Sequence, residues 1–342
     1  MTASSGSGAV AGGLARHIPV LARPVIDWLA VRPGGLYVDA TFGGGGYARA
    51  ILQTANARVI GIDRDPAAIA QAVSLAAAAG GRLELFADRF SNLDTIVGGT
   101  NCADGIVFDL GVSSMQLDEA SRGFSFRFDG PLDMRMSDTG PSAADVIARA
   151  GERELAAIIA ELGEEKRARA IARAIVRTRQ KGAIDSTRAL AEIVSAVMPA
   201  RGHAIHPATR TFQALRIFVN DELSELALGL AAAERALKAS GRLVVVAFHS
   251  LEDRIVKNFL ISRSRTPAGS RHRPEAAAAP STFRVLTRRP QTPDESELAA
   301  NVRARSAKLR AAERTEASAR RNDIDDLMPR LPRLADIMRG AA

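Results

Sequence analysis

The 342-residue sequence predicts an α/β protein with a doubly wound, Rossmann-like, mainly parallel sheet and an inserted all-helical domain. Two observations predict this fold. From Leu36 to Asp109, short apolar runs alternate with helical stretches, which implies crossover units between parallel strands. Between Asp109 and Arg242 the alternation stops, and helical patterns punctuated by Gly and Pro take its place.

Seven segments have the apolar character of strands. They are Leu36–Asp39, Arg58–Asp63, Arg82–Phe86, Gly105–Asp109, Arg242–Phe248, Phe283–Leu286 and Ser306–Ala311. The first five predict the sheet, and the last two are expected to extend it, the second as an antiparallel edge. Helices are expected over Ala67–Ala79, started by Asp65 and Pro66, and over Leu251–Leu260. The low-complexity stretch Ser262–Pro280 predicts a mobile loop.

The break in the alternation divides the chain, whose length suggests two domains or one domain enlarged by an insertion. We expect a flexible N-terminal segment over 1–16 and a discontinuous sheet domain over 17–122 and 220–314. The inserted helical domain is expected over 123–219, and a C-terminal tail over 315–342.

One helix of the inserted domain has two contrasting faces. Its apolar positions recur at helical spacing, at Ile171, Ala174, Ile175 and Thr178. The opposite face is cationic and comprises Lys166, Arg169, Arg173 and Arg177. This face is either a solvated helix surface or a surface that binds phosphates.

The composition, 46% apolar and 25% charged, is typical of a globular protein that folds in water. No stretch approaches the ~20 apolar residues that span a bilayer, and the N-terminus has no apolar signal core, so we expect a cytoplasmic protein without a membrane partner. The single cysteine, Cys102, fits a reducing compartment. A net charge of +8 and a pI near 10.4 favour a polyanionic partner, either RNA or DNA.

A glycine-rich segment, Asp39 to Tyr47, follows the first predicted strand. Its four consecutive glycines allow a sharp turn and a close approach of a ligand to the backbone. Gly43, Gly45 and Ala48 also fit the dinucleotide pattern, and Asp63 is placed to bind ribose hydroxyls in either cofactor class. An NAD-dependent dehydrogenase is therefore a competing prediction.

The charges beside the glycines favour a cationic cofactor. A dinucleotide loop must hold an anionic pyrophosphate, whereas here Asp39 directly precedes the turn. S-adenosylmethionine carries a sulfonium and an ammonium group and no phosphate, so this acid favours it. Asp88 and Asp109 follow or end further strands, and Phe90 either covers an adenine ring or packs on the core.

Long motifs of this sequence resemble those of the bacterial RsmH (MraW) family, from about His17 to Arg314. They are Thr41–Gly43, Ile62–Pro66, Asp109–Ser114, Arg122–Phe126, Gly130–Met136, His206–Ile217, Phe248–Arg254 and Arg303–Arg310. The resemblance implies a class I S-adenosylmethionine-dependent methyltransferase that modifies the N4 atom of a cytidine in the decoding region of 16S rRNA. It implies 16S rRNA as the partner, within a small ribosomal subunit or its precursor, and leaves the oligomeric state open.

The resemblance also assigns residues to the cofactor. These are Gly45, Gly46, Tyr47, Asp63, Phe90, Asp109 and Gln116. The family usually has His at the position of Tyr47, and a phenol does not reproduce the two nitrogens of an imidazole.

Asp109 is the candidate acceptor of a hydrogen bond from the target amine, which would localise the nitrogen lone pair, and Asp133 is a reserve candidate. His206 and His249 are isolated and more typical of structural roles. No metal is expected, because the sequence has no cluster at ligand spacing.

The candidate phosphate contacts are Arg169, Arg173, Arg177, Arg210 and Arg216, with ion pairing as the alternative for the last two. A non-catalytic basic RNA-binding assembly factor is the second competing prediction.

Overall fold

The computed structural model describes residues 19–54, 56–137, 139–198, 206–265, 280–320 and 327–340. The expected N-terminal segment 1–16 lies outside these residues, as do positions 266–279 of the expected loop. The start of that loop was predicted wrongly, because the preceding helix continues to Ser264. No described helix is long and apolar enough to cross a membrane.

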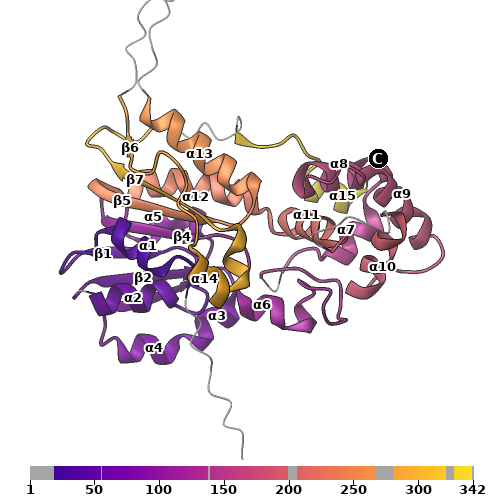
Figure 1. Cartoon of the computed structure of the whole chain (residues 1–342), viewed down its shortest axis with the longest axis horizontal. Coiled ribbons are helices and arrows are strands. Elements are labelled where there is room, and N and C mark those ends of the chain that lie inside the picture. Colours follow the sequence, from indigo (N-terminus) through magenta and orange to yellow (C-terminus); the bar gives the residue numbers. More distant parts are fainter. Residues whose placement is uncertain are drawn as a thin grey trace, which may run out of the picture.

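Seven strands form one sheet in the order β3-β2-β1-β4-β5-β7-β6 (Figure 1). They are β1 Leu36–Asp39, β2 Arg58–Asp63, β3 Leu83–Ala87, β4 Ala103–Asp109, β5 Leu237–Ala247, β6 Phe283–Val285 and β7 Lys308–Arg314. Strands β1 to β5 are parallel, and β7 runs antiparallel to both β5 and β6. The predicted α/β fold class is confirmed. The expected antiparallel edge was misplaced, since β7 lies inside the sheet and β6 forms its edge.

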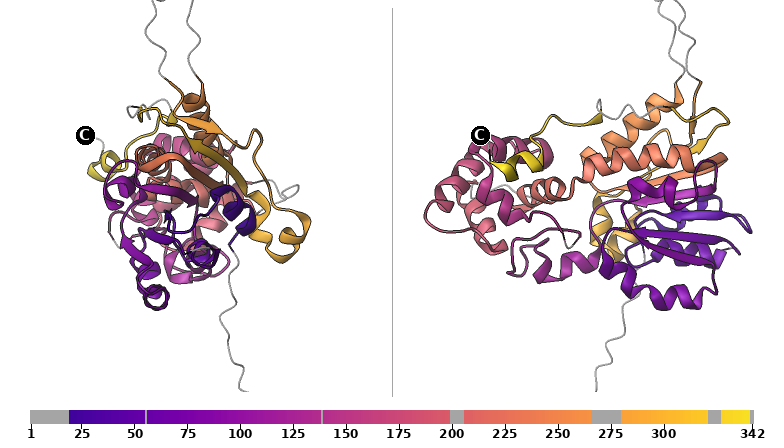
Figure 2. Two further views of the ribbon diagram at one scale, coloured as in Figure 1. Left: turned by 90° about the vertical axis from the view of Figure 1, so that its left-hand side faces the viewer. Right: turned by 180° about the vertical axis from the view of Figure 1, so that it is seen from behind.

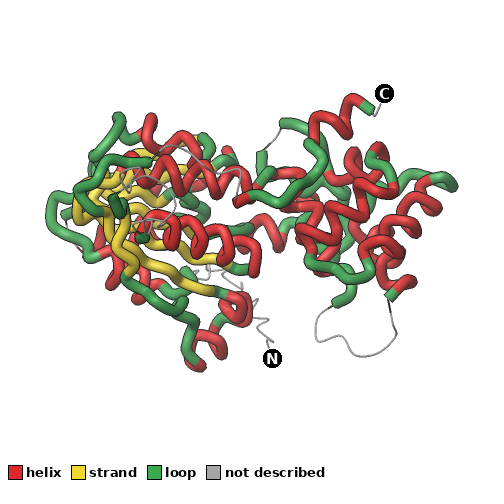
Figure 3. The backbone as a smooth tube through the Cα atoms, turned by 90° about the horizontal axis from the view of Figure 1, so that it is seen from above, coloured by secondary structure: helices red, strands yellow, loops and turns green. Residues whose placement is uncertain are grey.

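Helices cover both faces of the sheet, as Figure 3 shows from above. The helices of the part of the chain that holds the sheet are α1 Ala22–Leu29, α2 Gly46–Thr54, α3 Pro66–Gln71, α4 Val73–Ala78, α5 Leu93–Ile96, α12 Glu222–Ala236, α13 Ser250–Ser264 and α14 Glu295–Ala300. Helix α6, Ser114–Asp118, lies beside the sheet on the side of the helical body (Figure 1). Ile106 and Phe108 of β4 belong to the core under α12, and Val107 belongs to the core under α1. Both sides of β4 are apolar because a parallel sheet is buried on both faces.

The expected helix Ala67–Ala79 is two short helices, α3 and α4. The break lies at Ala72, whose amide donates to the carbonyl of Ile69 over 3.1 Å. This i to i−3 bond tightens the turn and interrupts the α-helical ladder.

Five helices form a separate body beside the sheet (Figures 1 and 2). They are α7 Ala143–Arg149, α8 Glu152–Gly163, α9 Ala168–Arg179, α10 Thr187–Val197 and α11 Thr209–Asn220. Helix α8 packs on α9 and α11 through Leu155, Ile158, Ile159 and Leu162, which are at most 2% exposed. These helices fall in the segment expected as an insertion, and the boundaries 123 and 219 stay a prediction.

The C-terminal tail returns to this helical body. Its helix α15, Leu334–Arg339, contacts α7 and buries Ile337. The guanidinium of Arg149 in α7 donates to the carbonyl of Met338 over 2.8 Å. The sequence predicted a tail over 315–342 but no helix within it, because the packing of α15 on α7 depends on residues that are distant in the chain.

Asn220, the last residue of α11, joins the two bodies. Its side-chain amide donates to the carbonyl of Met134 over 2.7 Å and accepts from the amide of Met136 over 2.8 Å. Its own carbonyl accepts from Arg64, which follows β2, over 2.8 Å. The side chain is 2% exposed, so these bonds satisfy groups that water does not reach.

We predict that Asn220→Ala lowers the free energy of unfolding by about 2–4 kcal/mol, because it leaves two buried backbone groups without partners. Urea denaturation followed by circular dichroism measures the change. Asn92→Ala is the matched control, since it removes an exposed amide bonded to Asp88 and should change stability by less than about 0.5 kcal/mol. Equal losses in the two variants would contradict the assignment.

Candidate active site

The carboxyl ends of β1, β2 and β4 meet at one edge of the sheet and bring Asp39, Asp63 and Asp109 together. The glycine turn closes over these ends. Gly43 and Gly45 have φ of 49° and 71°, the left-handed region that favours glycine. A Cβ on Gly45 would lie 2.6 Å from the ring of Phe42, so this position also has no room for a side chain.

Asp63 fixes the turn. Its Oδ2 accepts from the amide of Gly43 over 2.7 Å, and its Oδ1 accepts from the amide of Asp65 over 2.8 Å. Burial raises the pKa of Asp63 above its usual value, although these amides oppose the rise. Each oxygen keeps acceptor capacity for a ligand hydroxyl.

Asp39 and Asp109 each present a buried carboxylate oxygen without a hydrogen-bond partner. Burial, opposed by the amide of Ala48 and reinforced by Asp63, raises the pKa of Asp39 to about 7. Burial and the charges of Asp39 and Glu252 raise the pKa of Asp109 well above its usual value. Two orphaned acidic oxygens at one crevice suit a cationic ligand and disfavour a pyrophosphate.

Thr41 was not singled out from the sequence. Its Oγ1 accepts from the backbone amide of Asp109 over 2.6 Å and so ties the glycine turn to the end of β4. The residue lies in a quoted motif, but a hydroxyl next to glycines does not reveal its bonding partner.

Tyr47 does not present its side chain to the crevice. The phenol donates to the carbonyl of Val20, and the residue is 3% exposed within the core under α1. Burial raises the pKa of the Tyr47 hydroxyl well above its usual value. Tyr47 therefore presents only its backbone to the crevice, and its aromatic ring belongs to the core under α1.

Phe90 and Gln116 make internal contacts. Phe90 packs edge to face on Phe108 at 5.3 Å between ring centroids, and it lies against Gly229 of α12. The amide group of Gln116 donates to Asp65 over 2.9 Å, and its oxygen caps the amide of Ser113. Both residues support the walls of the crevice, and their cofactor contacts stay predictions.

Asp133, the reserve candidate, is held by Arg135. Three side-chain and backbone hydrogen bonds from Arg135, 2.6–2.9 Å long, reach its carboxylate. Burial opposes the effect of Arg135, but the pKa of Asp133 is still lowered. Such a carboxylate is a poor proton acceptor, and its position fits the ordering of the Gly130–Met136 loop.

The arginines that are candidate RNA contacts differ in their exposure and in how far other protein residues already bind their guanidinium groups. Arg169, Arg173 and Arg177 are exposed on α9, and of the three only Arg173 contacts an acid, Glu152, at 3.5 Å. Arg210 is exposed and donates to the carbonyl of Glu164 over 3.0 Å. Arg216 bonds both oxygens of Glu222 at 2.8 Å and is only 15% exposed, so its geometry is that of an ion pair.

Glu222, His249 and Glu252 form a cluster with metal-like spacing, unforeseen because Glu222 lies 27 residues before His249 in the sequence. Nδ1 of His249 accepts from the backbone amide of Glu252 over 3.3 Å, so a ring proton lies on Nε2, which is 3.0 Å from Oε1 of Glu252. Nε2 then lacks the lone pair that a metal needs, and Arg216 already balances Glu222. We assign the cluster to two pairs, Arg216 of α11 with Glu222 of α12, and His249 with Glu252 at the start of α13.

The strand order with a reversed β7, and the acidic crevice at a glycine turn, define a class I S-adenosylmethionine-dependent methyltransferase. A family model described as the MraW methylase family matches residues 14–315. The chain belongs to this family, which removes the NAD-dependent dehydrogenase and the non-catalytic factor as alternatives.

Named relatives agree with this family. The chain is 64% identical over 329 residues to ribosomal RNA small subunit methyltransferase H of Nitrobacter winogradskyi, covering 95% of this chain and 98% of the relative. It is 60% identical over 328 residues to the protein of that name from Bradyrhizobium diazoefficiens, covering 95% and 99%. A solved rRNA methylase structure from Streptococcus thermophilus aligns with a TM-score of 0.36 at 13% identity, over 86% of this chain and 95% of that one.

Asp39→Asn should separate stability from cofactor binding. With a pKa of about 7 in the fold and ~3.9 unfolded, the native state binds more protons in this range, so stability falls as pH rises from about 4 to 7. The variant should therefore gain melting temperature over the wild type at pH 8, and less at pH 5. Its affinity for S-adenosylmethionine should fall by about tenfold or more.

Scanning calorimetry and isothermal titration measure the two effects. Asp27→Asn, at an exposed acid near Arg23, is the control and should change neither. A variant that binds S-adenosylmethionine like the wild type would refute the role of Asp39.

Proposed function

We propose that this chain methylates the N4 atom of a cytidine in the decoding region of 16S rRNA. The observation that supports it most is the crevice of orphaned acids, in a chain whose relatives carry the name of a small-subunit rRNA methyltransferase. The substrate is a small ribosomal subunit or its precursor, and the site of action is the cytoplasm. Wild-type protein should transfer tritium from labelled S-adenosylmethionine to small-subunit RNA, with the label on one cytidine.

S-adenosylmethionine supplies a methyl group on a sulfonium, and the residues of the chain bind and orient. Asp39 and Asp109 line the part of the site that faces the cationic groups of the cofactor, and Asp63 holds its ribose hydroxyls. The backbone of the glycine turn is the part of the chain that approaches the cofactor most closely. The backbone of Tyr47 remains available beside Gly46. These roles follow from acceptors without partners and from the absence of a Cβ on the glycines.

Asp109 also acts on the acceptor. The exocyclic amine of cytosine is a weak nucleophile because its lone pair is delocalised into the ring. Oδ1 of Asp109 is buried without a partner, so it can accept a hydrogen bond from the amine and hold it in line for transfer. A positive charge in the crevice favours the ionised form of Asp109, which counters the effect of burial on its pKa.

The exposed arginines of α9 bind the RNA backbone. Arg169 and Arg177 make no hydrogen bond or ion pair with another described residue, so their guanidinium groups are free for phosphates. Arg173 and Arg210 contribute two further guanidinium groups, which already contact Glu152 and the carbonyl of Glu164. We do not extend this role to Arg216, whose donors are occupied by Glu222.

Asp109→Asn is expected to lower kcat by about a hundredfold or more, the range of acid–base contributions, while the affinity for S-adenosylmethionine changes less than tenfold. Single-turnover tritium transfer and calorimetric titration measure these two quantities. Asp133→Asn is the comparison and should reduce kcat less. Near-normal turnover in Asp109→Asn at saturating S-adenosylmethionine would remove the catalytic role of Asp109.

Replacing Arg169, Arg173 and Arg177 together by Gln should flatten the dependence of log affinity on log salt by up to about three phosphate contacts' worth. Filter binding to small-subunit RNA at several salt concentrations gives the slope. A control triple with the same charge loss, Arg288, Arg289 and Arg305 to Gln, alters exposed positions outside α9. If both triples flatten the slope equally, α9 is not a specific RNA surface.

A further inference from the structure

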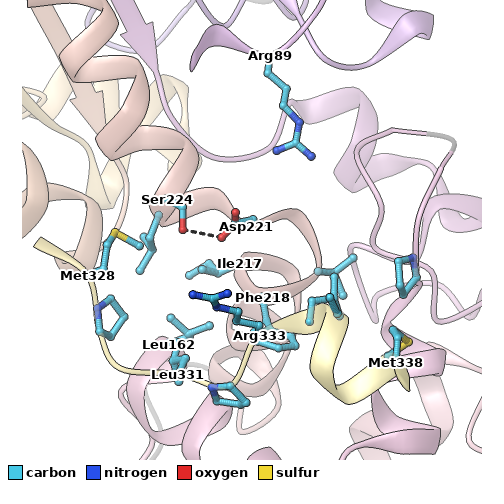
Figure 4. Close-up of a pocket in the computed structure, with 17 residues that line it drawn as sticks. Arg89, Leu162, Ile217, Phe218, Asp221, Ser224, Met328, Leu331, Arg333 and Met338 are labelled. Atoms are coloured by element: carbon cyan, nitrogen blue, oxygen red, sulfur yellow. Dashed lines mark hydrogen bonds between the residues drawn. The ribbon is translucent and has the colours of Figure 1, made fainter. Parts of the chain in front are cut away.

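A cavity of about 720 Å³ lies where the two bodies and the C-terminal segment meet (Figure 4). Arg89, which follows β3, lines it from the sheet. Asp221 and Ser224 line it from the turn between α11 and α12. Leu162, Ile217 and Phe218 line it from the helical body, and the C-terminal segment adds Met328, Leu331 and Arg333. The volume is within the range of small-molecule sites.

Most of the lining is apolar, and its exposed apolar surface comes mainly from the C-terminal segment. Met328 and Leu331 are half-buried against the core, and Phe218 is 8% exposed. Asp221 accepts from the hydroxyl of Ser224 over 2.7 Å, so this acid is already engaged. Such walls suit the flat face of an uncharged ring.

Two guanidinium groups and the carboxylate of Asp221 carry the charges of the lining. Figure 4 shows Arg89 pointing toward the cavity from the sheet side, with Arg333 on the other side beside Phe218. The side chain of Arg89 is 47% exposed and contacts Glu225 at 3.3 Å, whereas Arg333 is exposed and its guanidinium has no hydrogen bond or ion pair among the described residues. An apolar cavity flanked by two arginines fits a ring that carries an anionic group.

The position of the cavity relates it to the proposed reaction. Arg89 lies between Asp88 and Phe90 at the carboxyl end of β3, which pairs with β2 where Asp63 ends that strand. A target base enters an active site only after it leaves its stack, and the bases beside it lose stacking partners. A protein with few aromatic residues must cover such bases with aliphatic and thioether groups.

We propose that this cavity receives an unpaired nucleotide of the substrate RNA next to the target cytidine. Its base packs on Met328, Leu331 and Phe218, and its phosphate lies between Arg89 and Arg333. The C-terminal segment is then a substrate-binding element rather than a structural appendage. This inference rests on the proposed function, because it names a second contact for the same RNA.

A matched pair of charge variants on the C-terminal segment tests the phosphate contact. Arg333→Gln removes a lining guanidinium, and Arg330→Gln removes an exposed one on the same segment that does not line the cavity. Arg333→Gln should raise KM for small subunits lacking the methyl group by about tenfold and reduce the salt slope by about one, with kcat unchanged. Arg330→Gln should change KM less than twofold.

A second pair of variants tests whether the substrate needs the open volume of the cavity. Ala335→Trp places an indole at an exposed lining position of α15, and Asp336→Trp places it at an adjacent exposed position outside the cavity. Only Ala335→Trp should raise KM, and circular dichroism and S-adenosylmethionine titration should match the wild type in both.

The proposal is overturned if Arg333→Gln and Ala335→Trp keep wild-type KM and salt slope, or if each matched control shows the same loss. The proposed function fails separately, if wild-type protein transfers no methyl group to small-subunit RNA.

A third experiment uses photocrosslinking from RNA that carries 4-thiouridine next to the target cytidine. Crosslinks to residues that line the cavity, such as Phe218, Met328 or Leu331, support the proposal, and crosslinks confined to peptides that do not line it contradict the proposal.

Discussion

The turn Asp63-Arg64-Asp65 after β2 is the constraint on which both the crevice and the domain arrangement depend. Asp63 holds the glycine turn through the amide of Gly43. Arg64 donates to the carbonyl of Asn220 at the end of α11, and Asp65 accepts from Gln116 and Arg122. Three consecutive side chains therefore set the cofactor site and the helical body relative to one strand end, so a displacement of the turn would move both.

The crevice is assembled at the expense of stability. A buried carboxylate oxygen without a partner is unfavourable, and Asp39 and Asp109 provide two of them within one site. The fold tolerates them because β1 and β4 lie at the centre of a sheet buried on both faces, which stabilises the strand ends. A cation beside the two acids would offset the charge of both, which fits acids rather than amides at these positions.

The sequence was sufficient for the backbone of the site and insufficient for its side chains. Asp39, Asp63 and Asp109 could be placed together because parallel strands end at a common edge. The direction of Tyr47 could not be predicted, because it depends on the carbonyl of Val20 in another element. The pairing of Arg216 with Glu222 likewise depends on a helix junction, whereas the exposed face of α9 follows from helical spacing alone.

Net charge alone therefore misjudges where an RNA would bind. Many of the 46 basic residues are engaged, as Arg122 is with Asp65, Arg235 with Asp94 and Arg310 with Asp253. The guanidinium groups that remain free among the described residues are fewer, and they include Arg169 and Arg177 on α9 and Arg333 on the C-terminal segment. Both elements belong to or pack on the helical body, whereas the buried acids Asp39 and Asp109 lie at strand ends of the sheet. The arginines proposed to contact RNA and the acids proposed to hold the cofactor therefore come from different parts of the chain, so the two proposed ligands do not compete for the same groups.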